Sequence, residues 1–290
     1  MDIDGKTALV TGGASGIGAA IAEALAKRGC TVVIADFDLP GAEERAARLG
    51  PAVSAVHVDA ADTQSIAAMA EKVWQATGGV DLVFANAGVS AGAPLLNATP
   101  EQFDWQFAVN VRGVWATCRE FANRMMFSHR PGHLVMTASE HSLGMQHTMM
   151  GFYTATKHAV LGMADVMRHE LPANIGLSIL CPGIVATNLH DQARFGVLEA
   201  PDDDSRALAA AVMRKGMPLE GYGEKVLAAV ARGDFFIVTH PSSFAAAERR
   251  FHEIRDAFAA QAPATSPDIK YEVNAVAAEA IAELEQGGTA

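Results

Sequence analysis

Short apolar runs alternate with helix-length stretches over the first 185 residues of the chain. Most of these runs are short and apolar on both faces, which is typical of parallel strands that helices cover on both sides. The alternation predicts an α/β fold with a Rossmann-type, doubly wound parallel sheet of about seven strands. The predicted strands are Thr7–Thr11, Thr31–Asp36, Val53–Val58, Val80–Ala85, His133–Ala138 and Gly176–Cys181. The predicted helices are Gly16–Arg28, Gly41–Leu49, Thr63–Thr77, Pro100–Phe127 and Phe152–Leu171.

The pattern also predicts how the chain is divided. Residues 1–240 are expected to form a single dinucleotide-binding and catalytic domain, which a helix at Leu219–Arg232 and a strand at Phe235–Val238 complete. Residues 189–218 are polar and rich in Met and Arg, which predicts a helical insert on the substrate side. Residues 241–290 are expected to form a C-terminal helical extension made of two amphipathic helices.

Composition and charge exclude several classes of protein. Half of the residues are hydrophobic and 19% are charged, which favours a buried core over disorder. The net charge is −11 without a basic cluster, so a nucleic acid is not an expected partner. No apolar run reaches the roughly 18 residues of a membrane span. No His, Cys, Asp or Glu cluster has metal-ligand spacing, so we expect no metal.

Three scattered cysteines, without a Cys-x-x-Cys pair, are expected to be reduced thiols. The segment Met1–Lys6 has no apolar signal core. Together these features predict a cytoplasmic protein.

A glycine-rich turn follows the first predicted strand, with Gly12, Gly16 and Gly18 in the order GxxxGxG. Glycines allow a tight turn and a close approach of the backbone to a pyrophosphate, and the start of the next helix presents free N–H groups to that anion. A glycine-rich turn alone is weak evidence, but its place between the first strand and helix predicts a dinucleotide site.

Asp36 ends the second predicted strand, 18 residues after Gly18. A carboxylate there can accept hydrogen bonds from both adenosine ribose hydroxyls and would repel a 2′-phosphate. Phe37, rather than a basic residue, follows it, and Ser15 precedes Gly16. We therefore expect NAD as the cofactor in preference to NADP; the alternative is an exposed aspartate at a strand end.

With these features, the chain resembles the classical short-chain dehydrogenase/reductase family from about Lys6 to Leu189. The resemblance depends on motifs that occur in the family's order, although each alone is weak. They are Thr11-Gly12 with Gly16-Ile17-Gly18, Asn86-Ala87-Gly88, Asn110, Ser139, Tyr153-x-x-x-Lys157, and Pro182-Gly183 with Thr187. The resemblance implies a homo-oligomer, usually a tetramer, with a dimer as the alternative.

The resemblance also implies roles for individual residues. Asn110, Ser139, Tyr153 and Lys157 would be catalytic. Residues that match the family's cofactor site would bind the dinucleotide: Gly12, Ser15, Gly16, Ile17, Gly18, Asp36, Asp59, Ala60, Asn86, Ala87, Gly88, Tyr153, Lys157, Pro182, Gly183, Ile184, Val185 and Thr187. Ser139 precedes Tyr153 by 14 residues, one more than is common in the family. We interpret this as a loop insertion, which leaves Ser142 as a less favoured alternative.

Tyr153 and Lys157 lie four residues apart in a predicted helix and therefore share a face. To act as a base near neutrality, a tyrosine must lower its pKa by roughly three units, about 4 kcal/mol. A lysine cation about 4 Å away supplies an energy of that order at an effective dielectric of about 20. We therefore expect Lys157 to lower the pKa of Tyr153, which exchanges the proton while the cofactor exchanges the hydride.

Apolar segments at Met145–Phe152 and Leu189–Val197 favour an apolar substrate, aromatic ones included. Glu140, His147 and Met150 are candidate substrate contacts, although each has an ordinary structural explanation. The sequence thus predicts an NAD(H)-dependent oxidoreductase that interconverts a secondary alcohol and its ketone. A lyase or epimerase on the same fold would give a product without net redox change, and a non-catalytic NAD-binding protein would show binding without turnover.

Overall fold

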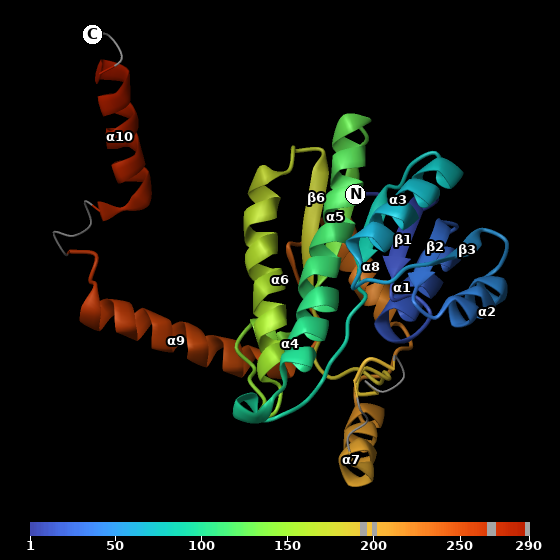
Figure 1. The fold of residues 1–290 in the computed structure, drawn as a ribbon. Coiled ribbons are helices and arrows are strands. Elements are labelled where there is room, and N and C mark those ends of the chain that lie inside the picture. The colour runs from blue at the N-terminus through green and yellow to red at the C-terminus, as the bar shows by residue number, and fades with distance from the viewer. Residues whose placement is uncertain (192–195, 199–201, 266–270, 288–290) are drawn as a thin grey trace. The chain divides into compact units, whose positions relative to one another are not determined.

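The computed structural model describes residues 1–191, 196–198, 202–265 and 271–287. A parallel sheet of seven strands organises the described part of the chain up to Ser243 (Figure 1). The strands are β1 (Thr7–Thr11), β2 (Thr31–Asp36), β3 (Val53–His57), β4 (Leu82–Ala85), β5 (Gly132–Thr137), β6 (Ile175–Cys181) and β7 (Phe236–Val238). Their order across the sheet is β3-β2-β1-β4-β5-β6-β7. The order reverses between β1 and β4, and a ligand crevice is expected outside the carboxyl ends of the strands at such a point.

Helices cover both faces of this sheet (Figure 1). The helices up to Arg232 are α1 (Gly16–Lys27), α2 (Leu39–Leu49), α3 (Thr63–Thr77), α4 (Pro100–Phe107), α5 (Val114–Phe127), α6 (Gly151–Glu170), α7 (Asp203–Arg214) and α8 (Tyr222–Arg232). One core cluster joins Val10 to side chains of α1, α2 and α8, and a second joins Leu9 to side chains of α3, α5 and α6. Adjacent strand residues therefore enter different cores, which is why the strands are apolar at nearly every position.

The predicted fold class is confirmed, and most element ends lie within two residues of the prediction. The helix predicted over Pro100–Phe127 differs, because the π-helical turn η2 (Ala108–Gly113) separates α4 from α5. A π turn inserts a residue into the helical repeat and is frequent at functional sites. Here it contains Asn110, one of the predicted catalytic residues.

The chain divides into two compact units, Met1–Ser243 and Phe244–Ala290. The first ends with the short helix η5 (Pro241–Ser243), and the second contains α9 (Phe244–Gln261) and α10 (Val273–Gly287). In the first unit, the predicted insert at 189–218 contains α7, but its residues 192–195 and 199–201 lie outside the described residues. Every described side chain of α7 is exposed or half-buried, so this helix adds nothing to the core.

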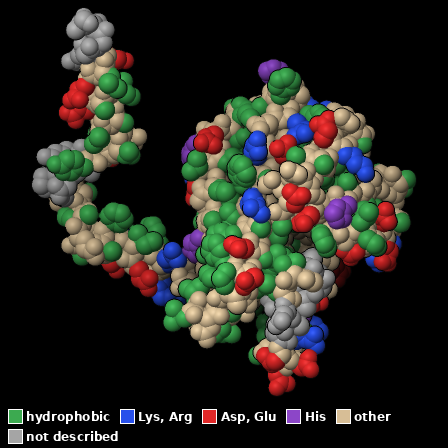
Figure 2. Space-filling view, viewed as in Figure 1, with side chains coloured by type: hydrophobic (Ala, Val, Ile, Leu, Met, Phe, Trp, Pro, Cys, Tyr) green, Lys and Arg blue, Asp and Glu red, His purple; other side chains and the backbone are tan. Residues whose placement is uncertain are grey.

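The visible surface mixes charges of both signs, with Lys and Arg side chains scattered among acidic ones (Figure 2). None of the helices in the described ranges combines the length and the apolar character that crossing a membrane requires. Within the same ranges, no three His, Cys, Asp or Glu side chains gather where they could hold a metal ion.

Candidate active site

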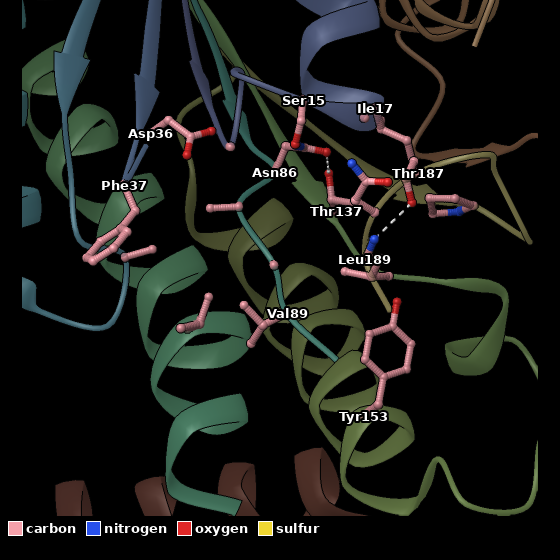
Figure 3. A pocket seen from close by; sticks show the side chains of 18 of the residues that line it. Ser15, Ile17, Asp36, Phe37, Asn86, Val89, Thr137, Tyr153, Thr187 and Leu189 are labelled. Atoms are coloured by element: carbon pink, nitrogen blue, oxygen red, sulfur yellow. Dashed lines mark hydrogen bonds between the residues drawn. The ribbon is translucent and has the colours of Figure 1, made fainter. Parts of the chain in front are cut away.

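A cavity of about 340 Å³ lies where β1, β2, β4, β5 and β6 end, as the reversal in strand order predicts. Asp36 and Phe37 lie at one end and Tyr153 at the other, with Ser15 and Ile17 from the start of α1 between them (Figure 3). The same cavity therefore joins the predicted nucleotide site to the predicted catalytic tyrosine.

The residues predicted to bind the cofactor line this cavity, with two exceptions. Ile184 is absent from the lining, and so is Gly18, which is buried behind the turn. The remaining ones come from the carboxyl ends of β1, β2, β3, β4 and β6 with the residues that follow them, and from α6: Gly12, Ser15, Gly16, Ile17, Asp36, Asp59, Ala60, Asn86, Ala87, Gly88, Tyr153, Lys157, Pro182, Gly183, Val185 and Thr187.

The glycine turn has the shape that a dinucleotide requires. Gly12 and Gly16 have backbone φ values of +66° and +57°, which residues other than glycine rarely adopt. A Cβ atom at Gly18 would overlap the carbonyl oxygen of Gly12. Ser15, the N-cap residue of α1, makes no side-chain capping bond. The Ser15 hydroxyl and the first N–H groups of α1 are thus available to a pyrophosphate, so the residues present fit a dinucleotide.

Hydrogen bonds to its backbone neighbours hold the Asp36 carboxylate at the cavity's edge. Its Oδ2 atom accepts from the Ala14 N–H at 3.0 Å, and its Oδ1 atom accepts from the Asp38 N–H at 3.0 Å. A carboxylate has about four acceptor sites, so capacity for ribose hydroxyls remains. Phe37 lines the cavity beside it.

Asn86 ties the central strands together below the cavity. The Thr11 hydroxyl accepts from the N–H groups of Asn86 and Ala87 at 3.0 and 3.1 Å. The Asn86 side chain donates to the Thr11 carbonyl at 3.2 Å and accepts from the Thr137 hydroxyl at 3.3 Å (Figure 3). These bonds connect the loops after β1, β4 and β5, which fixes the cavity floor.

Tyr153 and Lys157 lie one turn apart on α6 and are 8% and 3% exposed. The Lys157 ammonium donates to the Thr137 carbonyl at 2.9 Å and lies 5.5 Å from the centre of the Tyr153 ring. The predicted pair is therefore formed at the cavity, with the lysine directed to the end of β5.

The pKa of Tyr153 differs from the expectation. Burial raises it to about 12, a hydrogen bond with the Ser139 side chain opposes that rise, and the Glu140 carboxylate adds to it. Burial also lowers the pKa of Lys157, to about 8. The expected lowering considers only the charge of Lys157. Both groups also lose water when they are buried, and this desolvation has the largest effect on each pKa.

Ser139, rather than Ser142, is the serine beside the tyrosine. Ser139 is buried, hydrogen-bonds with Tyr153 and also donates to the Pro182 carbonyl at 3.4 Å. The Ser142 hydroxyl instead donates to the Ser139 carbonyl at 2.6 Å and lies 3.8 Å from the Cys181 sulfur. The geometry therefore favours the interpretation of an inserted loop residue.

Asn110 lies behind the predicted catalytic pair, Tyr153 and Lys157, and is fully buried. Its side chain accepts from the Val89 N–H at 2.8 Å, and donates to the Val89 carbonyl at 2.9 Å and to the Thr156 hydroxyl at 3.1 Å. A Cβ atom at Gly88 would lie 3.4 Å from Asn110 Oδ1 and 3.6 Å from Lys157 Nζ. Asn110 and Lys157 thus approach Gly88 from two sides, and Asn110 joins α6 to the loop after β4.

The three candidate substrate contacts are not among the residues that line the cavity. Glu140 is buried and accepts a hydrogen bond from Ser243, His147 lies 4.9 Å from the His141 ring, and Met150 pairs with Ala93. Leu189 and Val197, which bound one of the two apolar segments expected near the substrate, do line it. Sequence reasoning missed several other lining residues: Phe37, Val58, Ala61, Val89, Trp105, Val109, Thr137, Ala138, Asn188 and Met213. The spacing of Trp105 and Val109, four apart in a predicted helix, could have indicated one shared face.

Comparisons with known proteins agree with this geometry. A family model described as short chain dehydrogenase matches residues 6–196. A sorbitol dehydrogenase from Cereibacter sphaeroides is 32% identical over 82% of this chain and 95% of its own. A C alpha-dehydrogenase from Sphingobium sp. strain SYK-6 is 29% identical over 89% of this chain and 88% of its own.

A solved structure gives the same result. A short chain dehydrogenase/reductase from Burkholderia phymatum in complex with NAD has a TM-score of 0.83 and 33% identity, and the match covers 92% of this chain and 99% of that one. The chain therefore belongs to the short-chain dehydrogenase/reductase family of oxidoreductases.

Proposed function

We propose that the protein is an NAD(H)-dependent dehydrogenase that interconverts an apolar secondary alcohol, aromatic ones included, and its ketone, with Tyr153 as the general acid and base. The observation that carries this proposal is the cavity in which Asp36 lies at one end and Tyr153 and Lys157 lie at the other. Hydride exchange at the carbinol carbon is the chemistry that a bound nicotinamide supplies.

The protein's part of the reaction is to move one proton and to orient the substrate oxygen. Because burial raises the pKa of Tyr153 to about 12, the phenol is protonated near neutrality and can donate that proton to a ketone oxygen. The Ser139 hydroxyl, beside the phenol, can hydrogen-bond the same oxygen. In the direction of oxidation, Tyr153 accepts the proton as the phenolate, the form that the neighbouring Lys157 favours electrostatically when charged.

Asp36 supports NAD as the cofactor, so Asp36→Ala is expected to lower kcat/KM for NAD by about 10- to 100-fold. The variant loses a charged acceptor for the ribose hydroxyls and also the repulsion of a 2′-phosphate, so its preference for NAD over NADP decreases. Steady-state kinetics with both cofactors measure the change. Asp38→Ala, which removes the carboxylate that caps α2, is the control. An unchanged preference in Asp36→Ala contradicts the assignment.

The apolar lining supports an apolar substrate. Val89, Val109, Leu189, Val197 and Met213 offer no hydrogen-bonding side chain to a polyhydroxylated molecule. The similarity to sorbitol dehydrogenase favours a polyol as the second candidate. The two differ in the number of substrate hydroxyls that need partners inside the cavity.

A panel of secondary alcohols with NAD and with NADP tests the proposal. We expect benzylic and long aliphatic secondary alcohols to reduce NAD with a higher kcat/KM than sorbitol does. Faster oxidation of sorbitol would favour the polyol, and no turnover with any alcohol would contradict the dehydrogenase itself.

The cytoplasmic location and the assembly into a tetramer or dimer stay predictions.

A further inference from the structure

His240 follows β7 and contacts the segment after β6 that contains Pro182, Gly183 and Val185 of the cavity lining. The Gly183 N–H donates to His240 Nδ1 at 2.9 Å, and His240 Nε2 lies 3.1 Å from the Ile184 carbonyl oxygen. One imidazole ring thus bridges two successive residues of that segment.

The two backbone partners fix the state of the ring. An amide N–H can only donate, so Nδ1 must be the nitrogen without a proton. A carbonyl can only accept, so Nε2 must carry the proton. His240 is therefore the neutral Nε2–H tautomer. A hydroxyl chain supports this orientation, because Thr239 Oγ1 lies 2.8 Å from Nδ1 and 3.1 Å from the Tyr222 hydroxyl.

Gly183 has no room for a side chain because His240 and Glu140 occupy that space. A Cβ atom at Gly183 would lie 2.6 Å from His240 Cγ and 2.8 Å from Glu140 Oε2. The Ser243 hydroxyl donates to the same Glu140 oxygen at 2.5 Å, and the Glu140 N–H donates to the Pro182 carbonyl at 2.8 Å. The chain after β7 thus contacts both the loop that carries Ser139 and the segment after β6.

The other side of this segment is held by backbone bonds. The Met217 N–H donates to the Ile184 carbonyl at 2.8 Å, and the Ala186 N–H donates to the Met217 carbonyl at 3.0 Å. The Gly183 N–H donates to the His240 ring rather than to a backbone carbonyl. His240 thus holds the N–H side of the Pro182–Gly183 peptide group, whose carbonyl accepts from the Glu140 N–H and the Ser139 hydroxyl.

We infer that His240 is a positioning residue for the cofactor: it holds Gly183 and Ile184 in the conformation that receives NAD. Pro182 contacts Ser139 beside Tyr153, at the end of the cavity opposite Asp36, so this segment would receive the nicotinamide end. The inference rests on the proposed function, because it assumes that this cavity binds NAD. Without the ring, the Gly183 N–H loses its acceptor and the segment must be ordered when the cofactor binds, which weakens binding.

Two variants of similar size separate this role from simple packing. Asn places an oxygen near the position of Nδ1 and can still accept from the Gly183 N–H, whereas Leu fills the space without an acceptor. We expect His240→Leu to raise the Kd of NADH about tenfold, the equivalent of about 1.4 kcal/mol, and His240→Asn to stay within about threefold of the wild type. The KM for NAD should follow the Kd, with a smaller change in kcat.

NADH fluorescence titration measures the Kd, and amide hydrogen exchange of the cofactor-free protein gives a readout that does not depend on activity. Exchange at Gly183 should be faster in His240→Leu than in the wild type, and slower in His240→Asn than in His240→Leu. His169→Leu, the same change at an exposed histidine of α6, is the matched control.

Equal behaviour of the Leu and Asn variants, whether both resemble the wild type or both lose NADH to the same extent, would overturn the inference. If the wild-type protein binds no NADH, the proposed function fails, while the exchange at Gly183 still decides whether His240 orders the segment. If the wild type binds NADH and the variants do not differ, only the role of His240 fails.

Discussion

Replacing Tyr153 by phenylalanine is expected to lower kcat by about 10²- to 10⁴-fold, the usual contribution of a positioned general acid or base. The substitution removes one hydroxyl from a side chain that is 8% exposed and keeps the ring that packs edge-on against His141 at 5.2 Å. The fold should therefore persist, and the Kd of NADH should change by less than about threefold. Initial rates of ketone reduction at saturating NADH measure the loss.

Tyr271→Phe is the matched control, because it makes the same change on an exposed tyrosine of the other unit. Ser139→Ala gives an independent comparison, since it removes the hydroxyl that hydrogen-bonds with Tyr153 and keeps the proton donor. We expect a smaller loss of kcat in Ser139→Ala than in Tyr153→Phe. A Tyr153→Phe variant with more than about a tenth of the wild-type kcat would exclude this residue as the general acid.

Replacing Lys157 by methionine is expected to abolish most of the activity and, near neutral pH, to stabilise the cofactor-free fold. Burial lowers the pKa of Lys157 from 10.5 to about 8, which corresponds to a destabilisation of about 3 kcal/mol from burying the charged form. The variant also loses the hydrogen bond to the Thr137 carbonyl, and this loss cancels about 1 kcal/mol or more of the stability that it gains. A net gain of about 1–2 kcal/mol should raise the Tm by a few degrees.

The pH dependence has a definite sign. Below pH 8 the lysine is charged in both the folded and unfolded states, so the full cost of burying the charge is present. Between pH 8 and 10.5 the folded state releases the proton first, so the wild type gains stability as the pH rises. The stability advantage of Lys157→Met should therefore be largest near neutrality and decrease toward about pH 10.

Urea unfolding of the cofactor-free proteins at about pH 7 and about pH 10 measures this difference. Lys72→Met on the exposed side of α3 is the control, because the ammonium group of Lys72 stays hydrated in the folded protein. A Lys157→Met variant that is less stable than the wild type at neutral pH would contradict the burial cost. High activity in that variant would contradict the role of the ammonium beside Tyr153.

The sequence determined the sheet, its helices and most of the residues that line the predicted cofactor end of the cavity. Strands with two buried faces consist mostly of apolar residues, and a turn with positive φ at Gly12 and Gly16 requires glycine. Both features can therefore be recognised in the sequence itself. Asp36 could be placed because it ends a strand, and Tyr153 and Lys157 because four residues make one helical turn.

The tertiary structure decided which distant side chains meet and how much water they lose. His240 contacts Gly183 across 57 residues of sequence, and Glu140 faces Ser243 rather than the cavity. The pKa of Tyr153 rises although Lys157 is near, because Tyr153 is buried where α6 packs against residues 140–142 and β6. Spacing along one element is local information, whereas desolvation and contacts between loops arise only when the whole sheet has formed.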